Sequence, residues 1–170
     1  MQFAKDSFYA ALRERLAAVN PARTIVLNGA ERPALVVVEN ELPNAERWLP
    51  DTFYLEWGGI KMMQEAHGVA PIMGMQCMIT YFTVGSIECG VNRGRMLGTL
   101  DGELLQMCQP CYTEKQDFRQ SPSSDVGTGV FWTLPDFQTP TAAGELASHT
   151  ARLERKANMT VFFFPEETER

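Results

Sequence analysis

Long apolar segments are missing from this chain of 170 residues. No stretch of about 18 apolar residues occurs, so a membrane-spanning helix is not expected. The first residues, MQFAKDSFYAALRERL, carry charges throughout and lack the uninterrupted apolar core of an export signal. These two absences predict a protein that is made and used in the cytoplasm and has no membrane partner.

An excess of basic residues is also missing. Lys and Arg number 15 against 21 Asp and Glu, which gives a formal net charge of −6. A general nucleic-acid binder needs a basic face that neutralises phosphates. The acidic balance therefore argues against direct nucleic-acid binding.

Residues that carry common catalytic chemistry are scarce. The two histidines, His67 and His149, are isolated, and neither lies in a nucleophile motif such as G-x-S-x-G. The spacing of the carboxylates singles out no acid–base pair. We therefore predict no catalytic residues, no enzymatic activity and no cofactor.

Cys108 and Cys111 are the one close pair among the four cysteines. Such a C-x-x-C pair is half of a structural zinc site, but Cys77 and Cys89 are twelve positions apart and supply no second close pair. In a thioredoxin-like site the pair opens a helix, whereas here it follows a helical pattern. Two interpretations remain. The cysteines are small buried hydrophobic residues, or the chain is a small metal-binding or cysteine-dependent enzyme domain that uses Cys108 and Cys111.

Two helices are predicted from apolar residues that recur every three or four positions. The first covers residues 4–19 and ends at Asn20-Pro21, because the residue before proline disfavours the helical conformation. The second covers residues 91–107 and places its charged side chains, including Glu103, on a polar face. The apolar stripes are Phe8, Leu12, Leu16 and Val19 in the first helix, and Met96, Leu100, Leu104 and Met107 in the second.

Strands are predicted where β-branched and aromatic residues cluster between turn signals. The five segments are residues 24–27, 34–38, 52–57, 75–84 and 157–164. The first two are expected to pair as a hairpin across the loop NGAERP, and Gly58-Gly59 is expected to end the third. Residues 60–72 are interpreted as a connecting loop. Residues 75–84 carry apolar side chains on both faces, which predicts burial on two sides or a subunit contact.

Residues 112–145 are predicted to form a long irregular loop because they are rich in Pro, Gly, Ser and Thr. The segment nevertheless carries apolar side chains that a solvated linker would not carry. The candidate contact residues are Phe131, Trp132, Leu134 and Phe137. They pack either on the domain itself or on a neighbouring subunit.

Together these elements predict a single α+β domain over residues 1–170. We expect an antiparallel sheet of four to five strands with two helices packed on one face. The long irregular loop, residues 112–145, and a short charged C-terminal tail, EETER, complete the domain.

The order of these elements resembles the small α+β proteins of tailed bacteriophages and prophages that terminate the tail or complete the head–tail connection. The resemblance covers the first helix (FYAALRERLAAV), the long strand (MQCMITYFTV), the helix that follows it (NRGRMLGTLDGELLQM) and the closing strand (NMTVFFF). In that family, alternating strand residues lead through a polar turn to an arginine and two leucines four apart. The matching residues here are Ile79, Tyr81, Thr83, Arg93, Leu100 and Leu104. The chain departs from the family pattern at residues 112–145 and in its cysteines.

The resemblance implies a non-enzymatic structural protein of a phage or prophage particle that forms an oligomeric ring, often a hexamer. Its partners would be further copies of itself and other phage tail or head-connector proteins. It would be a virion component assembled in the cytoplasm of the bacterial host. No catalytic, cofactor or metal residues carry over. A ligand-binding α+β module is the remaining alternative.

Overall fold

The computed structural model describes residues 1–41, 48–64, 71–85, 92–143 and 152–165. Within these ranges the helices are α1 (Gln2–Val19), α2 (Val38–Glu41) and α3 (Asn92–Met107). The strands are β1 (Thr24–Leu27), β2 (Ala30–Pro33), β3 (Leu35–Val37), β4 (Phe53–Gln64), β5 (Ile72–Thr83), β6 (Tyr112–Asp117), β7 (Ser124–Trp132), β8 (Asp136–Phe137), β9 (Thr141–Ala143) and β10 (Arg152–Phe163). None of these helices has the length and apolar character that crossing a bilayer requires. The predicted charged tail lies outside the described residues.

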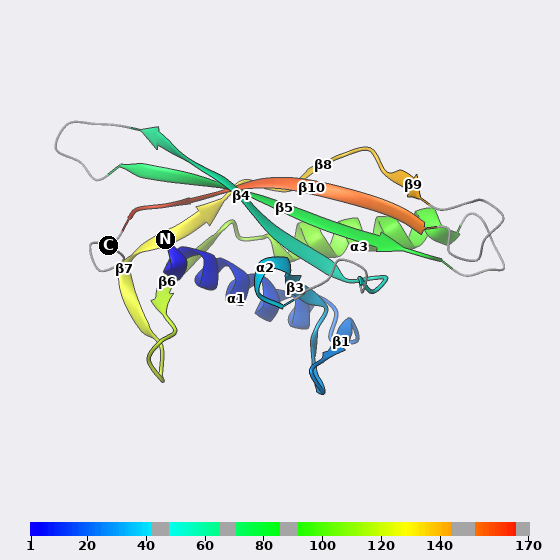
Figure 1. Ribbon diagram of the computed structural model, residues 1–170, viewed down its shortest axis with the longest axis horizontal. Coiled ribbons are helices and arrows are strands. Elements are labelled where there is room, and N and C mark those ends of the chain that lie inside the picture. Colours follow the sequence, from blue (N-terminus) through cyan, green and yellow to red (C-terminus); the bar gives the residue numbers. More distant parts are fainter. Residues whose placement is uncertain (42–47, 65–70, 86–91, 144–151, 166–170) are drawn as a thin grey trace.

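Eight strands form one mixed sheet that curves around the helices as a half-barrel (Figure 1). The order across the sheet is β3-β4-β5-β10-β7-β6, and β8 and β9 also pair with β10. β3 runs parallel to β4, whereas the other pairs are antiparallel. β1 and β2 form a separate two-stranded sheet. The prediction of a four- to five-stranded antiparallel sheet is therefore wrong.

The prediction of an irregular loop over residues 112–145 is wrong as well, and it accounts for most of the missing strands. This segment contains the β6–β7 hairpin, which is paired from Tyr112↔Phe131 to Asp117↔Ser124, followed by β8 and β9. Its turn-forming residues lie where the ladder turns or bends. Pro122 lies in the hairpin turn, and Gly127 has a φ of 80° within a break in the pairing register. Turn residues therefore interrupt the strands without abolishing them.

The predicted pairing of residues 24–27 with residues 34–38 is wrong. β1 pairs with β2 across the two residues Asn28 and Gly29, whose φ angles are 51° and 79°. Two left-handed residues give the tight turn that matches the twist of paired strands, and Asn-Gly is its preferred sequence. The run predicted at 34–38 instead becomes β3 and joins the large sheet in parallel with β4. This parallel pair is what makes the large sheet mixed.

Both long helices contribute to one apolar core on the inner face of the sheet. The predicted stripes are confirmed except at their outer members Val19 and Met96, which are only half-buried. Phe8, Leu12 and Leu16 of α1 are buried in one cluster with Leu100, Leu104 and Met107 of α3. The strand residues in this cluster include Leu55, Met75, Cys77, Ile79, Trp132, Met159, Val161 and Phe163. Every second residue of β5 and of β10 thus points toward the helices, and the alternate residues form the outer face.

Among the described residues, the outer face is covered at one end only. There, Tyr54 and Phe82 of the large sheet are buried in a smaller cluster with Ile25 of β1, and the Trp48 ring stacks on the Tyr54 ring. The other end of the outer face lies where β4 and β5 run toward the upper left of Figure 1. That end contains the surfaces considered next.

Candidate functional site

The cysteine pair is divided between core and surface. Cys108 directly follows α3 and is buried, with its Sγ 3.8 Å from Sδ of Met159, whereas Cys111 is half-buried. Burial, and secondarily the neighbouring Cys111 thiol, raises the pKa of Cys108. Burial also raises the pKa of Cys77 well above its ordinary value. A thiol that resists ionisation is a poor nucleophile and a poor metal ligand.

No group of three or more Cys, His, Asp or Glu side chains that could hold a metal ion is present in the ranges that the structure describes. Cys89, His67 and His149 lie outside those ranges. The C-x-x-C pair follows the helix as the sequence predicts. Within the described part of the chain it closes α3 and packs against β10.

Thiol labelling tests this assignment. At mildly alkaline pH, iodoacetamide should modify Cys111 in the native protein, while Cys77 and Cys108 should react rapidly only after unfolding, because only the thiolate reacts. Peptide mapping by mass spectrometry, with and without urea, measures each site separately. Native Cys108 reacting as fast as Cys111 would contradict the burial described above.

The four predicted contact residues do not share one surface. Trp132 is 4% exposed; its ring meets the Phe8 ring edge-on at 4.9 Å, and its Nε1–H donates to the carbonyl of Cys108 at 2.8 Å. Phe137 packs partly against the same inner cluster. Leu134 is 48% exposed, and Phe131 lies on the outer face. The Trp132 ring therefore packs within its own chain, and Phe131 and Leu134 remain accessible.

Phe131 belongs to an apolar row that crosses the outer face of the sheet. Phe131 pairs with Phe162 of β10 and with Tyr112 of β6, and its ring stacks on the Phe162 ring at 5.3 Å. Phe162 pairs in turn with Gly74 of β5. A Cβ at Gly74 would lie 2.7 Å from Cγ of Met63, so the Met63 side chain lies directly over the glycine.

We call Met63, Phe162, Phe131 and Tyr112 the outer row. Its two ends are about half exposed, Met63 at 52% and Tyr112 at 50%. The row thus carries apolar side chains from β4, β10, β7 and β6 across the uncovered end of the outer face. Contiguous exposed apolar residues of this kind mark interaction surfaces in soluble proteins.

A second apolar surface lies on the paired segments 60–64 of β4 and 72–75 of β5, which we call the arm. Ile60 pairs with Met75 and Met62 pairs with Met73, so Ile60 and Met62 share the inner face of the sheet. Ile60 is 37% exposed and Met62 is 54% exposed. The arm runs to the upper left of Figure 1, past the first turn of α1. The helices therefore leave Ile60 and Met62 partly exposed on the inner face of the arm, although their partners Met75 and Met73 contact the core.

The interpretation of residues 60–72 as a connecting loop is thus wrong for residues 60–64 and residue 72. Gly58-Gly59 does not end the strand; it lies in a register shift between the pairs Trp57↔Cys77 and Ile60↔Met75. Glycine inside a strand often marks a bulge of this kind. Ile60 and Met62 alternate with Lys61 and Met63, and this alternation was the signal for a strand.

The arm is also an edge of the sheet. β3 pairs only with Phe53 to Leu55, so β4 beyond that point pairs with β5 alone among the described strands. At the opposite edge, α1 closes β6. The N–H of Gln116 donates to Oγ of Ser7 at 2.8 Å, and Arg15 donates to the carbonyl of Tyr112 at 2.7 Å. An open edge strand with apolar side chains is prone to associate with another chain.

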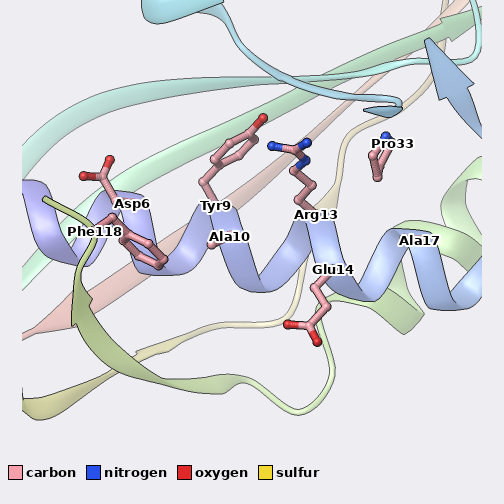
Figure 2. Close-up of a pocket in the computed structure, with 8 residues that line it drawn as sticks. All are labelled: Asp6, Tyr9, Ala10, Arg13, Glu14, Ala17, Pro33 and Phe118. Carbon is pink, nitrogen blue, oxygen red and sulfur yellow. The ribbon is translucent and has the colours of Figure 1, made fainter. Parts of the chain in front are cut away.

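A groove of about 600 Å³ follows the exposed side of α1. Its floor carries Tyr9, Ala10 and Ala17, and Figure 2 shows Phe118 beside the first half of the helix and Pro33 beside the second. Phe118 belongs to the β6–β7 turn and Pro33 to β2. In Figure 1 these two hairpins project below α1, one toward each end. We call this groove, with α1 as its floor and the hairpins as its ends, the saddle.

The charged residues of the saddle are Asp6, Arg13 and Glu14. Figure 2 shows Tyr9 and Arg13 rising on one side of α1 and Glu14 on the other. Arg13 also lines an adjoining polar cavity with Glu31, Glu39 and Glu41. The saddle itself therefore carries two carboxylates and one guanidinium.

Glu41 connects β2 to β3 beside the saddle. Its carboxylate accepts hydrogen bonds from the Arg32 guanidinium and from the N–H of Val37. Burial alone would raise the pKa of Glu41, but the bonds from Arg32 and Val37 outweigh it and lower the pKa. Because the folded value lies below the unfolded one, this stabilisation is present at neutral pH and is lost as the pH falls through the folded pKa.

A pH titration of stability tests this carboxylate. Glu41→Gln should be less stable than the wild type near neutrality, and the difference should shrink as the pH falls from about 7 to about 3. Urea unfolding at each pH measures it. Glu39→Gln is the control, because Glu39 lies on the same helix and is more exposed. A constant deficit for Glu41→Gln across this range would exclude the proposed ionic contribution.

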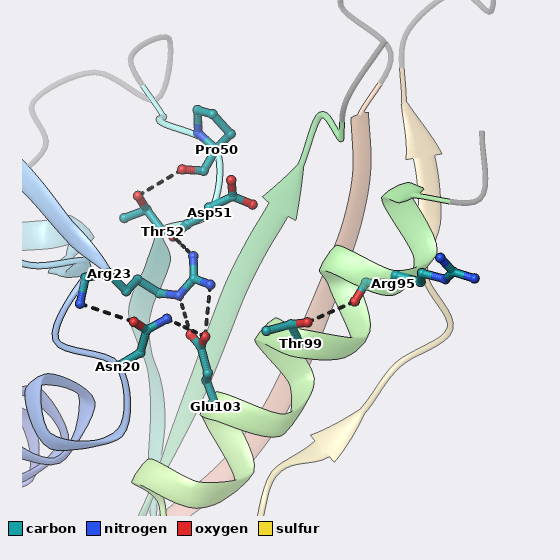
Figure 3. Close-up of polar contacts among 9 residues, drawn as sticks. Asn20, Arg23, Pro50, Asp51, Thr52, Arg95, Thr99 and Glu103 are labelled. Carbon is teal, nitrogen blue, oxygen red and sulfur yellow. Dashed lines mark hydrogen bonds and ion pairs between the residues drawn. The ribbon is translucent and has the colours of Figure 1, made fainter. Parts of the chain in front are cut away.

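An ion pair between the buried Glu103 and the partly buried Arg23 holds the C-terminal end of α1 in place (Figure 3). Glu103 of α3 is 7% exposed and accepts hydrogen bonds from Asn20, which caps α1, at 2.7 Å and from Nη2 of Arg23 at 2.9 Å. Arg23 also bonds Glu103 through Nε and donates to the carbonyl of Asp51 at 3.1 Å. The predicted polar face of this helix thus includes a buried residue, because Glu103 is enclosed by its ion pair. It joins α1, α3 and the start of β4.

Comparisons with known proteins do not assign the chain, because neither the models of protein families nor the curated proteins give a significant match.

Proposed function

We propose that this chain is a non-enzymatic structural protein of a phage or prophage particle. Copies of it assemble into an oligomeric ring that terminates the tail or joins head and tail. In this proposal the chain is a virion component assembled in the cytoplasm of the bacterial host. The order of its elements, which resembles such proteins, supports the proposal, and the arm is the single observation that carries it.

The arm supports self-assembly because it leaves apolar side chains on a sheet edge that the chain's own helices do not cover. Ile60 and Met62 continue the inner face of the sheet beyond the core, where a neighbouring subunit would bury them. Each large apolar side chain removed from water contributes about 1.5–3 kcal/mol. Ring contacts use two different surfaces on each subunit, and the arm supplies one of them.

The outer row provides a further surface for other proteins of the particle. It lies on the face of the sheet opposite to Ile60 and Met62 and carries the two aromatic rings of Phe131 and Phe162. Rigid aromatic side chains are enriched at protein interfaces because they bury much area at low entropic cost. In this proposal, tail or head-connector proteins contact the ring there.

The cysteine-dependent alternative is not supported by the geometry. Cys108 is enclosed between α3 and β10, and burial raises its pKa. Neither property suits a nucleophile or a metal ligand at neutral pH.

A charge placed on the arm tests the proposal. Met62→Glu should lower self-association by about tenfold or more, because assembly would bury an unpaired carboxylate. Sedimentation velocity over a range of concentrations measures the change. Leu105→Glu is the matched control: it makes the same kind of change at an exposed apolar residue of α3, away from the arm, and should assemble like the wild type. If both variants assemble equally well, the arm is not part of the contact between subunits.

A further inference from the structure

Methionine is concentrated in the arm. The chain has nine methionines, and four of them lie in the arm: Met62, Met63, Met73 and Met75. Unbranched thioether side chains adapt to irregular surfaces and are frequent where one protein binds another. The composition of the arm therefore suits a contact surface, and it also places oxidisable sulfur on that surface.

The arm methionines differ in their exposure. Met62 is 54% exposed and Met63 is 52% exposed, whereas Met75 is buried in the core cluster and Met73 packs partly against it. Met62 lies on the inner face of the arm, and Met63 lies on the outer face over Gly74. Met62 and Met63 are therefore the arm thioethers that a small solute reaches most readily.

We infer that Met62 and Met63 form a reversible oxidation site, and that their oxidation weakens the contact made by the arm. The oxidant is a peroxide. The inference rests on the proposed function, because it adds a means of regulation to the same surface.

The reaction adds one oxygen atom to each thioether. A lone pair of Sδ attacks an oxygen of hydrogen peroxide, the S–O bond forms as the O–O bond breaks, and water leaves after proton transfer. Sulfur loses two electrons, and the peroxide is reduced to water. Methionine sulfoxide reductases return the sulfoxide to the thioether, with electrons from thiols.

A sulfoxide is suited to water and not to an apolar contact. In the free chain the new oxygen on Met62 stays hydrated, because this side chain is about half exposed. In the proposed assembly it would lose that water beside Ile60, and burying a polar group without a partner is unfavourable. Oxidation therefore favours separate copies over the ring. The core keeps its packing, because its methionines are buried: Met75, Met107 and Met159.

Peroxide treatment of the purified chain tests the inference. Catalase stops the reaction, peptide mapping by mass spectrometry measures oxidation at each methionine, and sedimentation velocity measures self-association. We expect Met62 and Met63 to be oxidised about tenfold faster than Met75, and self-association to fall by about tenfold or more. Treatment with methionine sulfoxide reductases should restore it.

The double variant Met62→Leu with Met63→Leu is the matched control, because leucine has a similar volume and no oxidisable sulfur. This variant keeps all the cysteines and the other methionines. It should assemble like the wild type, both before and after peroxide treatment. If the treated variant loses assembly as the wild type does, oxidation acts elsewhere in the chain and the inference is wrong.

Two further results would overturn the inference and leave the proposed ring standing. Met62 and Met63 could be oxidised no faster than the buried Met75, or the oxidised wild type could assemble as before. The untreated sample separates these failures from a failure of the proposed function. A wild-type chain that is monomeric before treatment overturns both.

Discussion

Glu103→Ala should destabilise the protein by about 3 kcal/mol, because it removes the buried carboxylate that satisfies Asn20 and the partly buried Arg23 guanidinium. Glu103 is 7% exposed and receives hydrogen bonds from Asn20 and from two nitrogens of Arg23. Arg23 would retain only the carbonyl of Asp51. The free energy of unfolding from urea titrations of wild type and variant measures the loss.

A solvated ion pair provides the comparison. Lys5 and Glu39 are 3.1 Å apart, but the Glu39 side chain is 47% exposed. Glu39→Ala should cost no more than about 1 kcal/mol, because exposed pairs gain little beyond their hydration. If the two substitutions cost the same, Glu103 does not anchor α1 as described.

Trp132→Ala is expected to have an effect of similar size, about 3–5 kcal/mol, which is typical of truncating a buried aromatic residue to alanine. The ring contacts Phe8 edge-on and lies under the Arg15 guanidinium at 5.2 Å. Its Nε1–H bond to the carbonyl of Cys108 also ties β7 to the end of α3. Removing the ring therefore loosens α1, α3 and the sheet together. Thermal and urea unfolding measure the change.

Phe131→Ala is the matched control for Trp132→Ala. The two residues are neighbours on β7, but Phe131 is half-buried on the outer face, where its ring stacks on the Phe162 ring. Its truncation should cost about 1–2 kcal/mol. A larger loss for Phe131→Ala than for Trp132→Ala would mean that the two faces of β7 had been assigned the wrong way round.

The helices could be predicted from the sequence because their signal is local. The stripe Phe8, Leu12 and Leu16 repeats at helical spacing, and Asn20-Pro21 marks the end of α1. Both features lie within one short window, and no distant residue is needed to interpret them.

The sheet could be predicted only in part because its order depends on distant partners. Nothing near Leu35 indicates that β3 pairs in parallel with β4, and nothing near Tyr112 indicates its alignment with Phe131. Gly58-Gly59 is compatible with a turn or with a bulge, and only the pairing with β5 decides between them. Because of this ambiguity, the continuation of β4 into the arm could not be predicted from the sequence.

The candidate surfaces also depend on residues that are distant in the sequence. Phe131 was a predicted contact residue and lies on the outer row, but its companions Met63 and Phe162 come from other strands and are aligned only by the register. Glu103 has the position of a solvent-facing helix residue, and its partner Arg23 is 80 positions away. A pattern within one element cannot reveal a pair formed between two elements.

The most direct test of the central claim, that copies of this chain assemble through their arms, is the molar mass of the purified wild-type protein by light scattering from low micromolar to near-millimolar concentration. We expect a mass that reaches a whole-number multiple of 19.1 kDa, with closed rings in electron micrographs of the same samples. A single species of 19.1 kDa at every concentration would contradict it.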